Sequence, residues 1–248
     1  MEQAQYKLLE HRQKAHWWHR GRREILGSVL DRYLTRGAKS AIIEIGAGVG
    51  GNIDMLAQYG TVTAVEMDEA SRDLLCEIYP DMPVRPGALP DAQMFEGQSF
   101  ETAIMFDVLE HVEEEAASLR VIRDHVVPGG LLVISVPAYQ WLWGQHDERV
   151  HHKRRYTSES LRTALEDAGW EVKHLGYFNA LLFPLAVAAR MKDRVSRSKV
   201  STGSGVPNKY VNNLFYRVFR SETARVAKGG YPFGLSVVAV AQKRAVHA

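Results

Sequence analysis

The stretch that decides the fold is Glu44-Ile45-Gly46-Ala47-Gly48-Val49-Gly50-Gly51-Asn52. It follows residues 40–45 (SAIIEI), a β-branched run typical of a buried strand, and it leads into a helical pattern over residues 50–58. A strand-loop-helix turn of this kind needs glycines, because its backbone adopts unusual angles and must approach a ligand closely. The stretch therefore predicts a nucleotide-binding turn at the first strand of a sheet.

The same rhythm of short apolar runs and helical patterns continues through the chain, which predicts a parallel sheet covered by helices. We expect strands at 40–45, 61–66, 82–85, 100–106, 131–136, 170–176 and 235–242, and helices at 50–58, 69–79, 113–125 and 158–168. Pro128-Gly129-Gly130 is expected to form a turn after the third of these helices.

The predicted fold is a doubly wound, mostly parallel α/β sheet of Rossmann-like type within a single domain. Residues 1–39 are expected to form a helical lid and residues 40–178 the cofactor-binding core. Residues 179–230, which include the loose stretch SKVSTGSGVPN, are expected to form a helical cap insertion before a final strand in 231–248.

Composition excludes several classes of protein. The 31 basic residues nearly cancel the 29 acidic ones, so the net charge of +2 indicates no particular partner. The single cysteine, Cys76, cannot form an internal disulfide. No apolar run approaches the ~18–20 residues that cross a bilayer, and the polar N-terminus lacks the apolar core of a secretory signal. We therefore expect a soluble, cytoplasmic protein.

The glycine spacing alone leaves two nucleotides open. Gly46, Gly48 and Gly51 match the G-x-G-x-x-G pattern of dinucleotide sites, and Glu66 stands where a carboxylate accepts bonds from a ribose. Glu44, however, suits a ligand with an ammonium and a sulfonium group better than a pyrophosphate. Two further functions stay open at this point. One is an NAD-dependent oxidoreductase, which the glycine spacing fits, and the other is a non-catalytic protein that binds the sulfonium nucleoside S-adenosylmethionine.

The ordered set E-x-G-x-G-x-G, AVEMD, FDVLEHV and VPGGLLVISVP resembles the class I S-adenosylmethionine-dependent methyltransferases. The resemblance covers about residues 41–136, and the flanks HWWHRGRREIL and PFGLSVVAVA resemble a bacterial subgroup of small-molecule methyltransferases. It implies S-adenosyl-L-methionine as cofactor, S-adenosyl-L-homocysteine as product, and cofactor contacts from Glu44, Gly46, Ala47, Gly48, Gly50, Asn52, Glu66, Met67, Ala88, Leu89, Asp107 and Val108. Many members have an Asp after the third strand, where this chain has Gly87-Ala88-Leu89.

The N-terminal segment offers two further cofactor contacts. A lid helix can place Trp18 over the cofactor and Arg22 near its carboxylate. The alternative is a helix that packs its aromatic side chains on the core and leaves its arginines in water.

A dense group of polar residues follows the fifth strand, at the edge of the sheet where open α/β folds bind ligands. A neutral hydroxyl acceptor needs a base, and histidine has a suitable pKa. We expect catalytic roles for His111, His146, His151, His152 and Tyr156, and substrate contacts from Trp143 and Arg155. The alternative is a solvated basic loop.

A metal site is a second alternative for this region, although we expect none. Asp107, Glu110, His111 and His152 resemble the E-x-x-E-H…H magnesium set of 2′-O-methyltransferases acting on small-RNA ends. Carboxylates with one or two imidazoles can bind Mg²⁺ or Mn²⁺.

The insertion carries Leu181-Leu182-Phe183-Pro184-Leu185, followed by Arg190, Lys192, Arg194, Arg197 and Lys199. This pattern fits a substrate cap, and it is also compatible with peripheral contact with an anionic membrane. The chain lacks aromatic residues interleaved with a long basic stripe, so we expect no nucleic-acid partner. The expected reaction is methyl transfer to oxygen or nitrogen of a small acceptor, anionic or lipid-linked, of unknown identity. The oligomeric state is left open.

Overall fold

The computed structural model describes residues 13–196 and 206–245. The first twelve residues of the predicted lid lie outside the described residues, as do Arg197, Lys199 and most of the SKVSTGSGVPN stretch.

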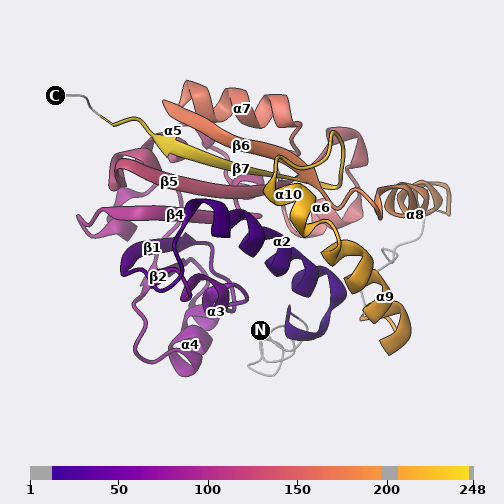
Figure 1. The fold of residues 1–248 in the computed structure, drawn as a ribbon, viewed down its shortest axis with the longest axis horizontal. Helices are drawn as coiled ribbons and strands as arrows, with labels where there is room; N and C mark the ends of the chain where they lie inside the picture. Colours follow the sequence, from indigo (N-terminus) through magenta and orange to yellow (C-terminus); the bar gives the residue numbers. More distant parts are fainter. Residues whose placement is uncertain (1–12, 197–205, 246–248) are drawn as a thin grey trace.

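A seven-stranded sheet in the order β3-β2-β1-β4-β5-β7-β6 forms the centre of the molecule (Figure 1). Strands β1 to β5 run parallel, whereas β7 is antiparallel to both β5 and β6. The strands are β1 Ser40–Ile45, β2 Gly60–Glu66, β3 Val84–Pro86, β4 Phe100–Phe106, β5 Val126–Pro137, β6 Trp170–Phe178 and β7 Ser236–Lys243. The predicted doubly wound, mostly parallel sheet is confirmed.

Helices cover both faces of this sheet. They are α2 Trp17–Tyr33, α3 Ile53–Leu56, α4 Glu69–Ile78, α5 Glu115–His125, α6 Gln145–Arg149, α7 Ser158–Asp167, α8 Phe183–Ser196, α9 Lys209–Arg220 and α10 Thr223–Ala227. The described residues also form three short 3₁₀ helices: η1 Ala92–Phe95, η2 Leu109–His111 and η3 Gln140–Leu142.

Alternate residues of the central strands enter two separate cores, as both buried faces of a parallel sheet require. In β1, Ile43 and Ile45 join a core that also contains residues of α5 and α7. Ile42 points the other way, into a core built with residues of α2, α9 and α10. The sheet is thus fixed from both sides, and its carboxyl edge becomes a rigid base for loops.

Several predicted bounds differ from the structure by a few residues, and two of the differences have a clear physical cause. Pro128-Gly129-Gly130 lies within β5 rather than in a turn, and the pairing of β5 with β4 shifts its register between Phe100 and Thr102. Gly129 has φ of +80°, so the strand passes through the shift on a residue without a side chain. The helix predicted over 50–58 is limited to α3, because the glycine turn occupies residues 46–51.

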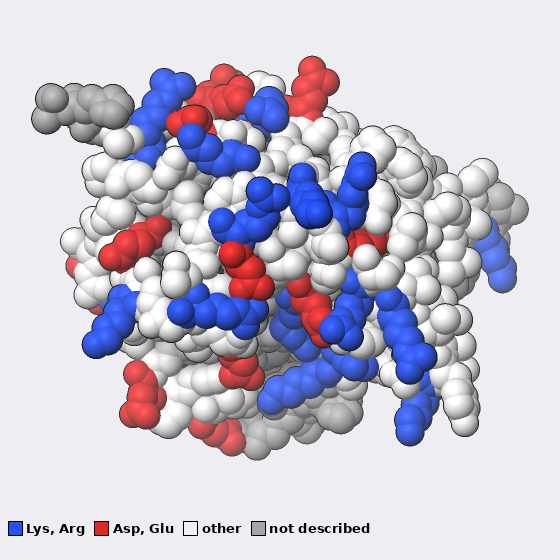
Figure 2. Space-filling view, viewed as in Figure 1, with Lys and Arg blue, Asp and Glu red and all other residues white. Residues whose placement is uncertain are grey.

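The segment between β6 and β7 is helical, as predicted, and it returns to the N-terminal helix. Helices α9 and α10 pack beside α2, so residues distant in sequence form one layer (Figure 1). On this face, basic and acidic side chains are interspersed (Figure 2), and Arg220 of α9 forms an ion pair with Glu24 of α2. Within the described ranges, none of the helices is both long and apolar enough to cross a membrane.

Candidate active site

The strand order reverses between β1 and β4, and in open α/β sheets ligands bind at the carboxyl end of such a switch point. The glycine turn after β1 lies at this point. The backbone N–H groups of Gly46 and Ala47 both donate to the carbonyl of Val65, which ties the turn to β2. The turn is therefore held by the sheet independently of any ligand.

Three of the four glycines of this turn, Gly46, Gly48 and Gly50, have different surroundings. A Cβ on Gly46 would lie 2.6 Å from Val108, and one on Gly50 would lie 2.8 Å from Leu75 of α4. At Gly48, with φ of +57°, a Cβ would have no described atom within 4 Å. Gly48 thus faces open space that a ligand can enter, whereas Gly50 lets the turn pack closely on α4. The cofactor contacts that the resemblance implies for both glycines stay predictions.

Glu44 is buried beside the turn with one carboxylate oxygen satisfied. Asn52 Nδ2 donates to its Oε1 at 2.8 Å, while its Oε2 is buried and accepts no hydrogen bond from the described residues. Burial raises the pKa of Glu44 to about 7, and the charge of nearby Arg22 opposes this shift. An acid in this state has one oxygen available for a cationic group.

Glu66 ends β2 and closes the other side of the turn. Its Oε2 accepts from the Gly48 N–H at 2.8 Å, and its Oε1 accepts from the Asp68 N–H at 2.9 Å. Each carboxylate oxygen retains a lone pair, so the group can still accept bonds from ribose hydroxyls.

The remaining predicted contacts along this edge are more open. The side chain of Met67 is 72% exposed, and Ala88 is also exposed. Leu89 is half-buried and packs against the core. The cofactor contacts expected of Met67, Ala88 and Leu89 therefore stay predictions.

Helix α2 reaches the site through Arg22, which is buried. Its guanidinium lies 2.9 Å from the carboxylate of Asp107 and 5.1 Å from the ring of Trp18. Asp107 follows β4 with φ of +58°, and its Oδ1 also accepts from Ser135 at 3.1 Å. The structure thus brings Trp18, Arg22 and Asp107 together. That Trp18 and Arg22 contact the cofactor stays a prediction.

Next to Asp107 lies a group of imidazoles, which we call the histidine cluster and define as His111, His146 and His152. The rings of His111 and His152 are 4.6 Å apart, and those of His146 and His152 are 6.2 Å apart. Desolvation lowers the pKa of both His111 and His146, so these two imidazoles are neutral at pH 7.

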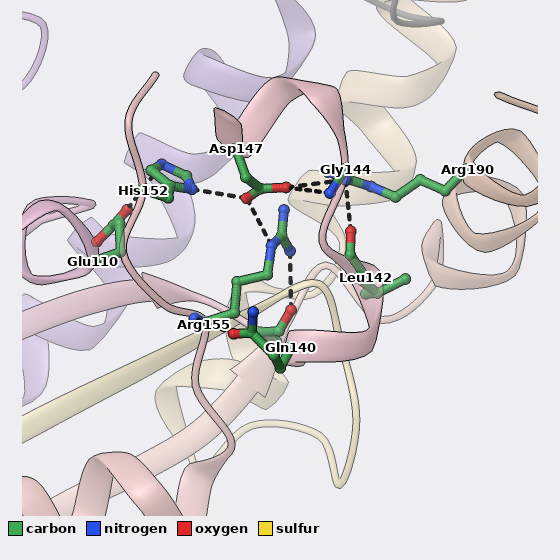
Figure 3. Close-up of polar contacts among 9 residues, drawn as sticks. Glu110, Gln140, Leu142, Gly144, Asp147, His152, Arg155 and Arg190 are labelled. Atoms are coloured by element: carbon green, nitrogen blue, oxygen red, sulfur yellow. Dashed lines mark hydrogen bonds and ion pairs between the residues drawn. The ribbon is translucent and has the colours of Figure 1, made fainter. Parts of the chain in front are cut away.

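Asp147 of α6 is fully buried and holds His152 of this cluster in place (Figure 3). It accepts from His152 Nδ1 at 2.8 Å, from Arg155 Nε at 2.7 Å and from the Gly144 N–H at 2.9 Å. Burial raises its pKa, but the bonds from His152 and Arg155 outweigh burial and leave the pKa below its ordinary value. Asp147 is therefore an anion that fixes the orientation of the His152 ring.

Several residues predicted to act on the substrate have other positions. Tyr156 is buried, and its hydroxyl donates to Glu115 at 2.6 Å, so the structure gives it a packing role. Arg155 is bound to Asp147 and to the carbonyl of Ala138, so it supports the cluster instead of an acceptor. His151 is exposed with φ of +59°, and Trp143 is half-buried at the end of η3.

Sequence reasoning missed the importance of Asp147 and Arg190. Arg190 of α8 donates to the carbonyl of Leu142 at 2.6 Å and lies 3.3 Å from Asp147 (Figure 3). The two side chains are 43 positions apart, and no local pattern links them. In the sequence, only the many charged residues around Asp147 pointed to this region. That pattern fits a solvated loop as well as a buried carboxylate with several partners.

A glycine turn at the switch point, an acid ending β2 and helices on both faces define a nucleoside-binding α/β domain of the methyltransferase type. The chain belongs to the methyltransferase domain family, whose pattern matches residues 17–175. The predicted resemblance is confirmed, and S-adenosylmethionine is the methyl donor of this class.

A relative from Mycolicibacterium smegmatis, named a probable S-adenosylmethionine-dependent methyltransferase, is 29% identical over 159 residues. The match spans 61% of this chain and 60% of the relative, so the chain covers less than two thirds of that protein.

Solved structures support the fold. Haemonchus contortus phosphoethanolamine N-methyltransferase 2, in complex with S-adenosyl-L-methionine, matches with a TM-score of 0.55 and 14% identity, over 88% of this chain and 51% of that one. The [4+2]-cyclase SpnF matches with a TM-score of 0.57 and 15% identity, over 90% and 81%. The fold therefore admits different reactions, and the reaction of this chain must be argued from its site.

Proposed function

We propose that this protein transfers the methyl group of S-adenosylmethionine to a hydroxyl oxygen of a small acceptor. The observation that carries the proposal is the histidine cluster beside Asp107, at the carboxyl edge of the sheet next to the glycine turn. A hydroxyl must lose its proton during transfer, and neutral imidazoles are the side chains best suited to accept it at pH 7.

The unsatisfied groups of the cleft fit the cofactor. The buried Oε2 of Glu44 would accept from the ammonium of the methionine portion, and Glu66 would accept from the ribose hydroxyls. Arg22, whose Nε is also buried without a described partner, would donate to the carboxylate. When bound, S-adenosylmethionine supplies an electrophilic methyl carbon whose transfer leaves a neutral thioether.

His146 is the group that we assign as the proton acceptor. Its imidazole is neutral. The carboxylate of Asp147 accepts its histidine hydrogen bond from His152 rather than from His146. The acceptor hydroxyl gives its proton to His146, and the oxygen forms a bond to the methyl carbon. The carbon–sulfur bond breaks with its electron pair remaining on sulfur, which yields a methyl ether and S-adenosylhomocysteine.

The surroundings favour an acceptor with an apolar part. Phe183 contacts both Trp141 and Phe233 edge to face, and the side chains of Trp141 and Phe233 are exposed. These aromatic side chains lie at η3, at the start of α8 and before β7. Arg155, which was expected to contact the substrate, is paired with Asp147, and its neighbour Arg154 is paired with Glu115.

The proposal is tested with a panel of small phenols, hydroxylated aromatic acids, aliphatic alcohols and primary amines. We expect S-adenosylhomocysteine to form with at least one hydroxyl compound that carries an apolar group. Turnover restricted to amines would overturn the assignment to oxygen. Cofactor binding without turnover on any acceptor, including those of a whole metabolite extract, would favour the non-catalytic alternative.

A further inference from the structure

Three side chains beside the cofactor cleft bring their ligand atoms together. One carboxylate oxygen of Glu110, one nitrogen of His111 and one nitrogen of His152 all lie within 4.8 Å of one another. Glu110 and His111 belong to η2, and His152 comes from the loop after α6. A single ion of ordinary size can therefore contact all three after a small inward movement of the side chains.

Glu110 is the strongest indication that something binds here. Its side chain is 1% exposed, and neither carboxylate oxygen has a hydrogen-bond partner among the described residues. His152 lies closest among the described side-chain contacts of Glu110, but its Nε2 is 3.9 Å from Oε1, beyond hydrogen-bond distance (Figure 3). Burying a carboxyl group without partners is costly, and a cation between Glu110 and the imidazoles removes this cost.

His152 is already oriented as a ligand. Because its Nδ1–H is donated to Asp147 at 2.8 Å, the lone pair is on Nε2, which faces Glu110. A carboxylate that holds the second nitrogen of a histidine is the usual support of metal-binding imidazoles. His111 has a similar support in a hydrogen bond with the backbone of Val150.

We propose that Glu110, His111 and His152 bind a divalent first-row transition ion, with Zn²⁺ bound more tightly than Mg²⁺. Two imidazoles and one carboxylate are the donors of many catalytic zinc sites, whereas Mg²⁺ prefers oxygen ligands and octahedral geometry. Asp107 is not a ligand, because its carboxylate is occupied by Arg22 and Ser135. The site therefore differs in its donors from the four-residue magnesium set considered from the sequence.

Three protein ligands leave at least one coordination position open. This step rests on the proposed function: an ion next to the cofactor cleft would polarise the acceptor hydroxyl and make its proton easier for His146 to accept. The ion would also fix the oxygen close to the methyl carbon.

The test measures metal binding alone, without cofactor or acceptor. The full chain is stripped with a chelator, dialysed and titrated with Zn²⁺, Co²⁺ or Mg²⁺ by calorimetry, and the bound metal is counted by mass spectrometry. We expect one Zn²⁺ per chain, visible absorption from bound Co²⁺, and binding of Mg²⁺ at least tenfold weaker than that of Zn²⁺.

Matched variants locate the ion. Glu110→Gln and His152→Ala should each weaken Zn²⁺ binding at least tenfold. Asp147→Asn, which removes the charge that orients His152 and also pairs with Arg155 and Arg190, should weaken it about tenfold to a hundredfold. Glu114→Gln, on an exposed neighbouring acid, and His125→Gln, on a histidine that stacks against Phe95, should bind as the unchanged protein does. Melting curves of all variants show which of them are folded.

Failure to bind one Zn²⁺ in the folded, stripped protein would overturn the proposal, and so would unchanged binding in folded Glu110→Gln and His152→Ala. Full methyl transfer by the stripped protein would remove the ion from catalysis and leave the proposed function intact. If the protein binds Zn²⁺ through these residues but methylates no acceptor, the metal site stands and the proposed function fails.

Discussion

At the scale of single residues, Glu44 is the side chain on which cofactor choice depends. Its position two residues before Gly46 predicted a cationic ligand, and the structure adds an oxygen that is buried without a described partner. Its pKa of about 7 means that the group gains or loses charge near physiological pH. A bound ammonium would favour the carboxylate form, because opposite charges at short range attract strongly in a buried site.

We expect Glu44→Gln to weaken S-adenosylmethionine binding by about tenfold or more at about pH 8, since a hydrogen bond to a charged group contributes about 1.5–3 kcal/mol. Affinity of the unchanged protein should rise as pH increases through about 7, and that of the variant should not. Calorimetric titration measures both. Equal affinities at high pH would show that the ammonium is bound elsewhere.

The same residue predicts how stability depends on pH in the absence of cofactor. The folded state raises the pKa of Glu44 from 4.5 to about 7, so it holds the proton more tightly than the unfolded chain does. Its contribution to the free energy of unfolding is fully present below about pH 4.5 and is lost as pH rises through about 7. Denaturant titrations should therefore find that Glu44→Gln gains stability relative to the unchanged protein between these two values.

His146 carries the prediction about proton transfer. His146→Ala should lower kcat by about 10²–10⁴-fold, the usual contribution of a general base, while S-adenosylmethionine binds with unchanged affinity. Initial rates and a cofactor titration on the same preparation separate the two effects. If His146→Ala keeps a normal kcat, a group other than His146 acts as the base.

At the scale of elements, the strands were the easiest to predict. The bounds of β1 and β4 agree with the sequence because both strands are apolar on two faces and are ended by a polar or glycine residue. The helix after the turn was overestimated, since Gly50 and Gly51 belong to the turn. β5 continues through Pro128-Gly129-Gly130 because it pairs with β4. This pairing involves a distant segment, so the local sequence could not predict it.

The glycine turn offers a prediction at this scale. Gly50→Ala should lower the free energy of unfolding by about 1–3 kcal/mol, because its Cβ would overlap Leu75. Gly48→Ala meets open space, so it should be less destabilising but should weaken cofactor binding more. Gly37→Ala is the matched control, with a similar φ of +75° and open surroundings far from the turn. If Gly48→Ala bound the cofactor as Gly37→Ala does, the ligand would not lie over the turn.

At the scale of the whole molecule, the sheet and its two cores bring the ends of β1, β2, β4 and β5 to one edge. The fold class, the cofactor and the cluster of histidines could be predicted because each depends on short, ordered motifs. The ion pairs of Asp147 could not be predicted. Asp147 of α6 meets Arg155 and Arg190 of α8 only because tertiary packing brings these elements together. The aromatic surroundings proposed for the acceptor likewise come from η3, α8 and the segment before β7.

The central claim is methyl transfer to a small hydroxyl compound, and one measurement tests it directly. The protein is incubated with S-adenosylmethionine labelled in its methyl group and with a metabolite extract of the host, and labelled products are separated and weighed. We expect a small product heavier by one methyl group, attached to oxygen, that His146→Ala forms about 10²–10⁴-fold more slowly. Bound cofactor with label in no product, or label attached only to nitrogen, would contradict it.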